Sequence, residues 1–457
     1  MTHPVVRSDT EGLHWPALPG LAGLPVLALL QQFEHSQWWP ADVLRRRQLE
    51  QLELLLLHAS ATVPFMAERL ERAGYRPHRP LTDDIWLSVP RMTREDLQTA
   101  GSAMISTRIP AAHGPTKAST TSGSTGRPVS VLKTALLRTF VRAITIRSHL
   151  WQKHDLGAKL AVIRNLGDGQ AAYPDGMALP DWGSMTRSTM VTGPSVSLSI
   201  TASTDQQLEW LTRHQPDYLL TFPSVAIELL RGSRADGGGP TRLRQVITIG
   251  EMVPPELPPL CREVWGASVG DIYSSQELGA MALQCPETGC YHVQSESVLL
   301  EVLDDAGKPC APGEVGRIVA TSLHNFAQPV IRYDIGDFAE VGEPCRCGRG
   351  LPTLNRILGR FRNMLTLPDG RRVWPRLSEA RYRDVAPIRQ FQVVQTSRTA
   401  IEIRLAVERP LTSEEEARLR AMILARIGYA AFDLAFTYQD GIPRSPGGKF
   451  EDFKSEI

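Results

Sequence analysis

The sequence lacks a long uninterrupted apolar run. Its most apolar early stretch, residues 18–33, contains two prolines and two glycines and is shorter than the ~20 apolar residues that a membrane-spanning helix needs. A basic flank and a small-residue cleavage site are also missing there, so we expect neither a membrane segment nor a signal peptide. The default expectation is a cytoplasmic protein.

An excess of either charge is also missing. Lys and Arg total 50 against 49 Asp and Glu, and the arginines are scattered, so nothing favours a nucleic acid or an anionic membrane as partner. Apolar residues make up 42% and charged residues 22%, which is an ordinary globular balance and excludes extensive disorder. A chain of 457 residues predicts two to three domains.

Cysteine is scarce and unevenly placed. Cys261 and Cys310 stand alone, whereas the other four of the six cysteines lie in two turns rich in Gly and Pro. In a reducing compartment such pairs favour metal ligands over disulfides, and structural zinc takes four sulfur or nitrogen ligands. Four ligands would come from the set Cys285, Cys290, His292, Cys345 and Cys347, with His292 as the alternative to Cys290. The other interpretation is a set of unrelated reduced thiols.

Strands and helices alternate through the middle of the chain. Residues 45–75 have apolar positions at helical spacing, interrupted at Pro64. Further on, short Val/Ile-rich runs alternate with helical segments, which favours an α/β fold with a parallel sheet. The expected strands are 159–165, 216–223, 243–251, 267–275 and 314–323, and the expected helices are 205–214 and 223–232.

The last part of the chain has a different pattern. Residues 297–323 predict a local antiparallel hairpin, 390–408 two alternating strands and 413–428 a helix with an acidic start. This ending predicts a small α+β module, with a boundary near Gly359–Asn363. We therefore expect an N-terminal domain over 1–359 and a C-terminal domain over 360–457.

The loop TTSGSTGRP (120–128) is too polar to bury apolar area. Gly123 and Gly126 permit turns in which backbone N–H groups converge on an anion, so a phosphate is the first hypothesis. The spacing GxxxxGK[ST] of the common nucleotide-binding loop is absent. A solvated Ser/Gly turn is the alternative.

TTSGSTGRP resembles the phosphate-gripping loop of the acyl-adenylate-forming superfamily, and four further motifs resemble that superfamily in the expected order. They are IYSSQELG (272–279), RYDIGD (332–337), LGR (358–360) and IPRSPGGKF (442–450). VPRMTREDL (89–97), the Gly-Glu pair at 250–251 and EPCRCGRGLP resemble the phenylacetate–coenzyme A ligase branch. The resemblance covers roughly residues 45–455.

The resemblance implies a role for each matching residue in adenylate formation. The pyrophosphate of ATP would be held by Thr121, Ser122, Gly123, Ser124, Thr125 and Gly126. Lys449 would stabilise the charge where the carboxylate attacks the α-phosphate, and Glu277 would hold Mg²⁺. The alternatives without catalysis are that Lys449 is an exposed surface lysine and that Glu277 is a glutamate at a helix N-terminus.

The same resemblance assigns the nucleoside. Asp337 would accept hydrogen bonds from the ribose hydroxyls with support from Arg360, and Tyr273 would stack on adenine. Ser274, Gly250 and Glu251 would line that pocket. A turn aspartate, a solvated arginine and ordinary packing are the alternatives.

Three positions depart from the superfamily pattern. Gln276 replaces the usual threonine, and Val129 stands where many members have lysine. Arg362, within Arg360–Asn363, is the expected pivot between the domains, since a hinge needs only to absorb a large dihedral change.

The resulting hypothesis is an ATP-dependent ligase that adenylates a small, aromatic carboxylic acid and passes the acyl group to coenzyme A. Transfer to an amine or a carrier-protein thiol is an alternative, as is a nucleotide-binding protein without chemistry. Aromatic residues of the middle region could form the acid pocket, although large aromatic side chains more often belong to cores. They are Trp151, Tyr173, Trp182 and Phe222.

Overall fold

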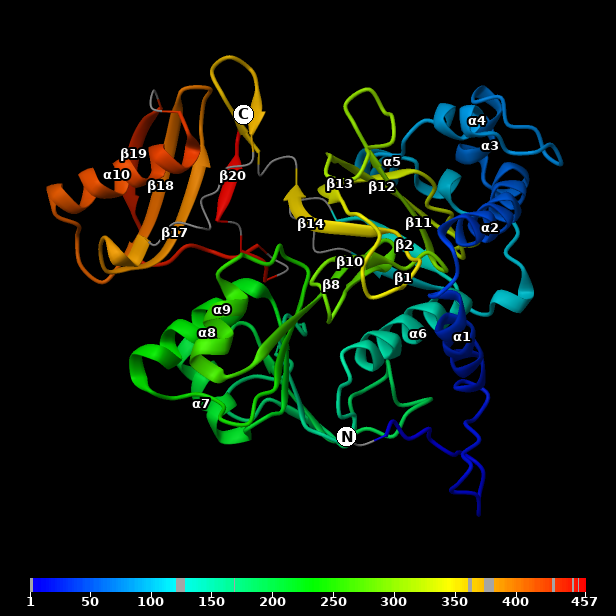
Figure 1. Ribbon diagram of the computed structural model, residues 1–457, viewed down its shortest axis with the longest axis horizontal. Coiled ribbons are helices and arrows are strands. Elements are labelled where there is room, and N and C mark those ends of the chain that lie inside the picture. Colours follow the sequence, from blue (N-terminus) through cyan, green and yellow to red (C-terminus); the bar gives the residue numbers. More distant parts are fainter. Residues whose placement is uncertain are drawn as a thin grey trace.

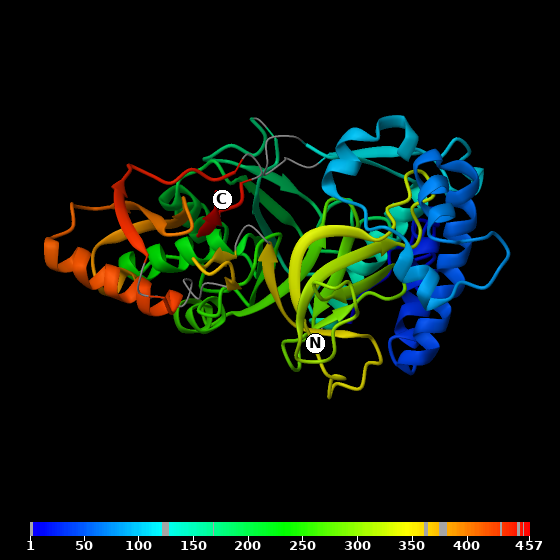
Figure 2. The same ribbon diagram turned by 90° about the horizontal axis from the view of Figure 1, so that it is seen from above.

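The computed structural model describes residues 3–120, 128–167, 169–360, 364–373, 382–429, 432–445, 448–450 and 452–457. Within these ranges the chain forms a large α/β body and a smaller C-terminal module. In both views the C-terminal module lies at the opposite end of the molecule from the N-terminal helices (Figures 1 and 2). None of the described helices has the length and apolarity that a bilayer span requires.

The N-terminal part is helical, as expected. It comprises α1 (Leu24–Ser36), α2 (Ala41–Thr62), α3 (Pro64–Arg72), α4 (Asp83–Ser88) and α5 (Arg94–Thr99). The break between α2 and α3 falls at Val63, whose φ of −118° and ψ of 100° are extended, because a following proline disfavours the helical conformation. Short 3₁₀ turns follow at Gly101–Met104 and Ala111–His113.

Within the described part of the chain, twelve strands form the central sheet, in the order β11-β12-β13-β14-β10-β9-β8-β7-β6-β3-β5-β4. The run β8-β7-β6-β3-β5 is parallel, which confirms the predicted α/β class. Its members are β3 (Leu160–Arg164), β5 (Ser195–Ser199), β6 (Tyr218–Thr221), β7 (Gln245–Ile249) and β8 (Ser268–Ser275), with β4 (Met177–Leu179) antiparallel at the edge.

Helices cover both faces of the parallel run. One face packs against α7 (Thr204–His214), α8 (Pro223–Asp236) and α9 (Leu257–Trp265), burying apolar residues such as Trp210 and Leu230. The other face packs against α6 (Ala135–Trp151) and α1, burying Ile144 and Ile247. Parallel strands need this double cover because both of their faces are apolar.

The other half of the sheet is antiparallel. It holds β9 (Gly279–Gln284), β10 (Tyr291–Val293), β11 (Val298–Leu303), β12 (Val315–Ser322), β13 (Tyr333–Val341) and β14 (Thr353–Arg360). β11 and β12 pair as the predicted hairpin over 297–323. A separate pair, β1 (Lys117–Thr120) and β2 (Ser130–Lys133), is also antiparallel.

The C-terminal module has a sheet of its own in the order β19-β18-β17-β20. Its elements are β15 (Leu365–Thr366), β16 (Arg372–Val373), a 3₁₀ turn at Tyr382–Asp384, β17 (Ile388–Gln395), β18 (Ala400–Val407), α10 (Ser413–Ile427), β19 (Asp433–Tyr438) and β20 (Phe453–Ser455). Among the residues that the structure describes, its apolar core runs from Leu365 to Phe453 and includes none of the larger body. The domain boundary at 359/360 stays a prediction, and this separate core is in keeping with it.

Candidate active site

A cavity of about 1680 Å³ opens at the carboxyl ends of the parallel strands and extends to the C-terminal module. Ligands of open α/β sheets bind in this position, outside the strand ends. The site residues predicted from sequence that line it are Gly250, Glu251, Tyr273, Ser274, Glu277, Asp337, Arg360 and Lys449. The structure therefore brings together residues spread over 200 positions of the chain.

Asp337 and Arg360 lie opposite each other on β13 and β14. Arg360 Nε is 3.6 Å from Asp337 Oδ1, and the Tyr273 hydroxyl donates to Oδ2 over 2.8 Å. Burial raises the pKa of Asp337, while Arg360 and the Tyr273 hydroxyl oppose the rise. The carboxylate is thus a held hydrogen-bond acceptor at the cavity wall, which suits the ribose role assigned to it.

Lys449 enters the cavity over Gly250, which follows β7. Gly250 has a φ of +83°, a conformation that glycine adopts without cost. A Cβ atom there would lie 3.1 Å from Cε1 of Phe222 and 3.4 Å from Cε of Lys449. An added side chain at Gly250 would therefore crowd Phe222 and touch the side chain of Lys449.

The ammonium group of Lys449 has charged neighbours of both signs. Burial lowers the pKa of Lys449 and Arg360 lowers it further, whereas three carboxylates oppose the shift. Those carboxylates belong to Glu251, Asp337 and Glu277. Lys449 is therefore a desolvated cation facing the carboxylates of the candidate nucleotide site, not an exposed surface lysine.

The loop that carries Lys449 is fastened to the larger body. Within the loop, Ser445 N–H donates to the Lys449 carbonyl over 2.8 Å. Between the two parts, Arg444 forms an ion pair with Glu228 at 2.8 Å and donates to the Ser224 hydroxyl over 2.6 Å. These contacts hold the loop against the start of α8.

Glu251 also joins the two parts. One carboxylate oxygen accepts from Phe450 N–H over 2.8 Å and the other from Ser224 N–H over 3.0 Å. Burial raises the pKa of Glu251, and these backbone donors oppose the rise. Glu251 lines the cavity as expected, but its carboxylate accepts hydrogen bonds from the backbone and is therefore not free to bind the adenine base.

Glu277 lies just beyond β8 and is only 6% exposed. Its cationic neighbours, Arg94 and Lys133, were not among the site residues predicted from the sequence. Arg94 Nη1 is 3.6 Å from Glu277 Oε1, and Lys133 Nζ donates to the Gln276 carbonyl over 2.5 Å. Burial lowers the pKa of Lys133, and Glu277 opposes that shift. A carboxylate on a cavity wall fits Mg²⁺, which binds through one or two carboxylates and substrate phosphates.

The predicted phosphate loop, Thr121 to Gly126, lies outside the described residues. Thr120, which precedes it, lines the cavity and pairs with Ser130 across the β1–β2 ladder. The expected pivot, Arg362, is also outside the described part of the chain. The roles of both segments stay predictions.

Four of the five candidate zinc ligands converge. The ligand atoms of Cys285, His292, Cys345 and Cys347 all lie within 4.8 Å of one another. Sγ of Cys345 and Sγ of Cys285 are 4.0 Å apart, and Sγ of Cys347 is 3.3 Å from Nε2 of His292. A tetrahedral zinc with bonds of about 2.3 Å to sulfur and 2.0 Å to nitrogen would give edges of similar length. This donor set fits zinc, and it favours His292 over Cys290.

Cys290 lies beside this cluster without belonging to it. The Thr288 hydroxyl is 3.2 Å from the sulfur of Cys290 and 3.2 Å from that of Cys345. The cluster, comprising Cys285, His292, Cys345 and Cys347, connects the β9–β10 turn to the loop between β13 and β14.

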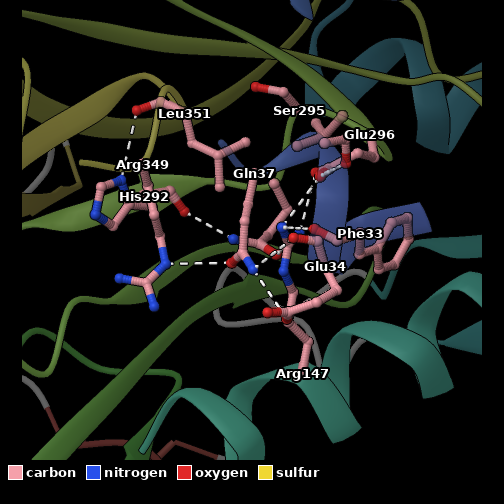
Figure 3. A network of polar contacts seen from close by, with 12 residues as sticks. Phe33, Glu34, Gln37, Arg147, His292, Ser295, Glu296, Arg349 and Leu351 are labelled. Carbon is pink, nitrogen blue, oxygen red and sulfur yellow. Dashed lines mark hydrogen bonds and ion pairs between the residues drawn. The ribbon is translucent and has the colours of Figure 1, made fainter. Parts of the chain in front are cut away.

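A polar network holds the imidazole of the cluster in place (Figure 3). Nδ1 of His292 is 3.4 Å from the Leu351 carbonyl, which leaves Nε2 for Cys347. Arg349, two residues before Leu351, donates to the Gln37 side chain over 3.2 Å. Ligand histidines are commonly oriented in this way through their second nitrogen.

One face of α6 also lines the cavity. Val141, Thr145 and His149, spaced four residues apart, all contribute to its wall. Of the aromatic residues suggested for the acid pocket, Trp182 and Phe222 line the cavity, whereas Trp151 and Tyr173 are absent from its wall. Trp151 packs under Arg147 and Arg349 instead, and Tyr173 is 36% exposed.

The architecture and this site define an adenylate-forming type of α/β enzyme. The family model described as AMP-binding enzyme matches residues 48–327, so the chain belongs to the AMP-binding enzyme family. Its curated relatives confirm the phenylacetate–coenzyme A ligase-like branch. The resemblance drawn from the motifs is thereby confirmed.

Relatives from three organisms carry that branch name. The chain is 27% identical over 388 residues to a phenylacetate–coenzyme A ligase of Thermus thermophilus, covering 81% of this chain and 82% of the relative. It is 25% identical to the Escherichia coli enzyme of the same name, covering 89% and 93%. Among solved structures, a 2-hydroxyisobutyryl–coenzyme A ligase in its postadenylation state matches with a TM-score of 0.73 at 18% identity, covering 99% of this chain and 97% of that one.

Proposed function

We propose that this protein is an ATP-dependent ligase that converts a small carboxylic acid into its acyl-adenylate and then into its coenzyme A thioester. The single observation that carries the proposal is the position of Lys449. Its side chain passes over Gly250 into a cavity that is also lined by Asp337, Arg360 and Glu277. A binding protein without chemistry has little use for a desolvated cation there. The names of the curated relatives support the same activity.

In the first step a carboxylate oxygen of the acid attacks the α-phosphorus of ATP, and the bond to pyrophosphate breaks. Two anions approach each other, so fixed positive charge stabilises the transition state most. Lys449 is the cation placed for this, while Asp337 and Arg360 hold the ribose. Glu277, together with the phosphates, would hold Mg²⁺, which would supply further charge neutralisation.

In the second step the thiol of coenzyme A attacks the carbonyl carbon of the adenylate and AMP leaves. Phe450 and Arg444 bind the C-terminal loop to the larger body, which supports an arrangement suited to the first step. The C-terminal module would then rotate before the second step. We propose Arg362 as the pivot and 1–359 and 360–457 as the two moving bodies.

We further propose that Cys285, His292, Cys345 and Cys347 bind a structural zinc ion. All four positions would be filled by protein, leaving none for substrate.

Pyrophosphate exchange tests the first step. The protein is incubated with ATP, Mg²⁺, labelled pyrophosphate and a panel of aryl and aliphatic acids, and exchange is expected with at least one acid. Mass detection of the products with and without coenzyme A then identifies the acceptor. Silence across a broad panel contradicts the proposal, and an adenylate that reacts with amines but leaves coenzyme A untouched redirects the second step.

A further inference from the structure

A series of hydrogen-bonded, buried side chains leads to the wall of the cavity and ends there at His149. His149 is 8% exposed and lies on the α6 face that lines the cavity, next to Trp182 at 5.0 Å between ring centroids. Its Nδ1 is 2.9 Å from Nδ1 of His154, and Nε2 of His154 is 2.5 Å from Oε1 of Gln245. Neither histidine has a role in the adenylation chemistry above.

At the other end of this hydrogen-bonded series, the partners of the Gln245 amide nitrogen fix the orientation of the Gln245 side chain. The Gln245 amide nitrogen donates to Gln152 Oε1 and to Ser268 Oγ, each over 3.1 Å. Both partners donate their own hydrogens to other groups: Gln152 Nε2 donates to the Gln284 carbonyl, and Ser268 Oγ donates to the Arg244 carbonyl. They therefore act as acceptors toward Gln245. Gln245 therefore presents its oxygen, an acceptor, to His154.

The proton positions on both rings follow from that orientation. His154 must carry its hydrogen on Nε2 to donate to Gln245, which leaves Nδ1 of His154 as an acceptor. His149 must then carry its hydrogen on Nδ1 to complete the 2.9 Å contact. Burial lowers the pKa of His154 and lowers that of His149 to about 3, so both rings are neutral. The bare lone pair of His149 lies on Nε2.

Nothing in the described protein satisfies that lone pair. Nε2 of His149 has no hydrogen-bond partner among the residues that the structure describes. The neighbouring Trp182 cannot serve, because its indole N–H donates to the Ala158 carbonyl over 2.9 Å. Nε2 of His149 is not among the fully buried unpaired side-chain atoms, so it is accessible from the cavity. A ligand that covers it without offering a donor would leave the acceptor unpaired, whereas a ligand with a donor would satisfy it.

The surrounding wall presents acceptors as well. We call the part of the cavity lined by Val141, Thr145, His149, Trp182, Thr186 and Ile272 the acyl chamber. The hydroxyl hydrogens of Thr145 and Thr186 point to the main-chain carbonyls of Val141 and Gly183. The polar side chains of this chamber thus offer lone pairs rather than hydrogens.

The depth of the chamber fits an acid whose far end reaches His149. Val141 lies against Gly279, where a Cβ would be 3.1 Å from Cγ2 of Val141, and Gly279 is two residues after Glu277. Along α6, Val141 and His149 stand about 12 Å apart. A carboxyl group near Glu277 therefore leaves room for a ring and one further substituent before His149.

We infer that His149 is a specificity residue whose Nε2 accepts a hydrogen bond from the acid, so that the preferred substrate carries a hydroxyl or amino group at the end remote from its carboxyl. This inference rests on the proposed function, because it assigns the acyl chamber to the acid. A substrate without the donor leaves the nitrogen unpaired, which is the situation in which enzymes discriminate most strongly.

The proton position can be measured without any activity. In the full chain labelled with ¹⁵N-histidine, and assigned by comparison with the His149→Phe variant, Nε2 of His149 should give the signal of a nitrogen that bears no hydrogen. A protonated Nε2 would overturn the inference even if the enzyme proves to be a ligase.

Selectivity supplies the second readout. Benzoic and phenylacetic acids with a hydroxyl or amino group at each ring position are compared in pyrophosphate exchange with the methoxy acid of the same position. For the best acid, wild type should prefer the donor by about 10- to 100-fold in kcat/KM. Equal rates for both members of every pair, with wild type active, would defeat the inference while leaving the proposed function intact.

Two variants separate hydrogen bonding from packing. His149→Phe keeps a ring of similar shape and should bring the selectivity ratio toward one. His154→Phe keeps the ring against Tyr218, at 4.5 Å in the native protein, but frees His149 to carry its hydrogen on either nitrogen, so the ratio should fall to an intermediate value. A variant that slows both acids equally and preserves the ratio would indicate packing alone and contradict the inference. Failure of all acids with wild type would instead contradict the proposed function, and the nitrogen signal would still decide the state of His149.

Discussion

The carboxylate of Glu251 accepts hydrogen bonds from Phe450 N–H at 2.8 Å and from Ser224 N–H at 3.0 Å, and so links the C-terminal loop to the start of α8. Phe450 is the residue after Lys449. The position of the candidate catalytic ammonium therefore depends on a carboxylate that was expected only to line the nucleotide pocket. Because Glu251 itself lies beside Gly250, one short segment shapes the space for the lysine and also fastens its loop.

Glu251→Gln should weaken this link. The amide has one acceptor oxygen and places an N–H group against a backbone donor, which costs about 1–3 kcal/mol in the docked arrangement. We expect pyrophosphate exchange to slow by about 10- to 100-fold while ATP affinity, measured by calorimetry, changes little. Glu209→Gln, on the exposed face of α7, breaks only a surface pair with Arg213 and is the control; equal rates in the two variants would contradict the role of Glu251.

Lys449→Ala should remove the cation from the attack on the α-phosphate. Removing one stabilising group of this kind typically costs ~10²–10³ in rate, so we expect exchange to fall at least 100-fold with ATP still bound. Lys454→Ala is the matched control, since Lys454 is on β20 of the same module and pairs with Glu456. Full exchange activity in Lys449→Ala would remove the main support for the proposed chemistry.

The fold could largely be predicted from the sequence because its signals are local. Val/Ile-rich runs and helical spacing predicted the strands β3, β6, β7 and β8 and the helices α7 and α8 within a few residues, whereas α9, between β7 and β8, was not among the expected helices. The order of the twelve strands and the pairing of β10 with both β9 and β14 depend on contacts distant in sequence. Periodicity carries no information on such contacts.

The site could be predicted only where a motif marked it. Lys449, Asp337 and Glu277 lie in recognisable motifs, and the structure gathers them. Arg94 and Lys133 were not predicted. Lys133 lies four residues after Val129, the position at which many members of the superfamily have a lysine. Their approach to Glu277 results from packing of α5 and β2, which no short motif describes.

Gly250→Ala should test the close approach of Lys449. The substitution adds strain at a φ of +83° and a Cβ 3.1 Å from Phe222 and 3.4 Å from Lys449. Gly370→Ala is a matched control, because Gly370 has a φ of +86° with nothing within 4 Å of the added Cβ. Both variants should lose about 1–2 kcal/mol of stability from the backbone, but only Gly250→Ala should slow exchange. An equal effect on exchange would show that the approach to Lys449 is unimportant.

Removal of a ligand should reveal the zinc site. Cys347→Ser and His292→Asn should each lower the bound zinc from about one per chain and lower Tm, because the metal contributes folding free energy only when its four ligands are assembled. Cys290→Ser should keep the zinc, since its sulfur is outside the cluster, and Cys310→Ser, elsewhere on the chain, should behave as wild type. Metal analysis of the purified proteins and thermal unfolding with and without a chelator give the comparison. Loss of zinc in Cys290→Ser with retention in His292→Asn would reassign the fourth ligand, and wild-type protein purified in zinc-containing buffer with no bound metal would contradict the site altogether.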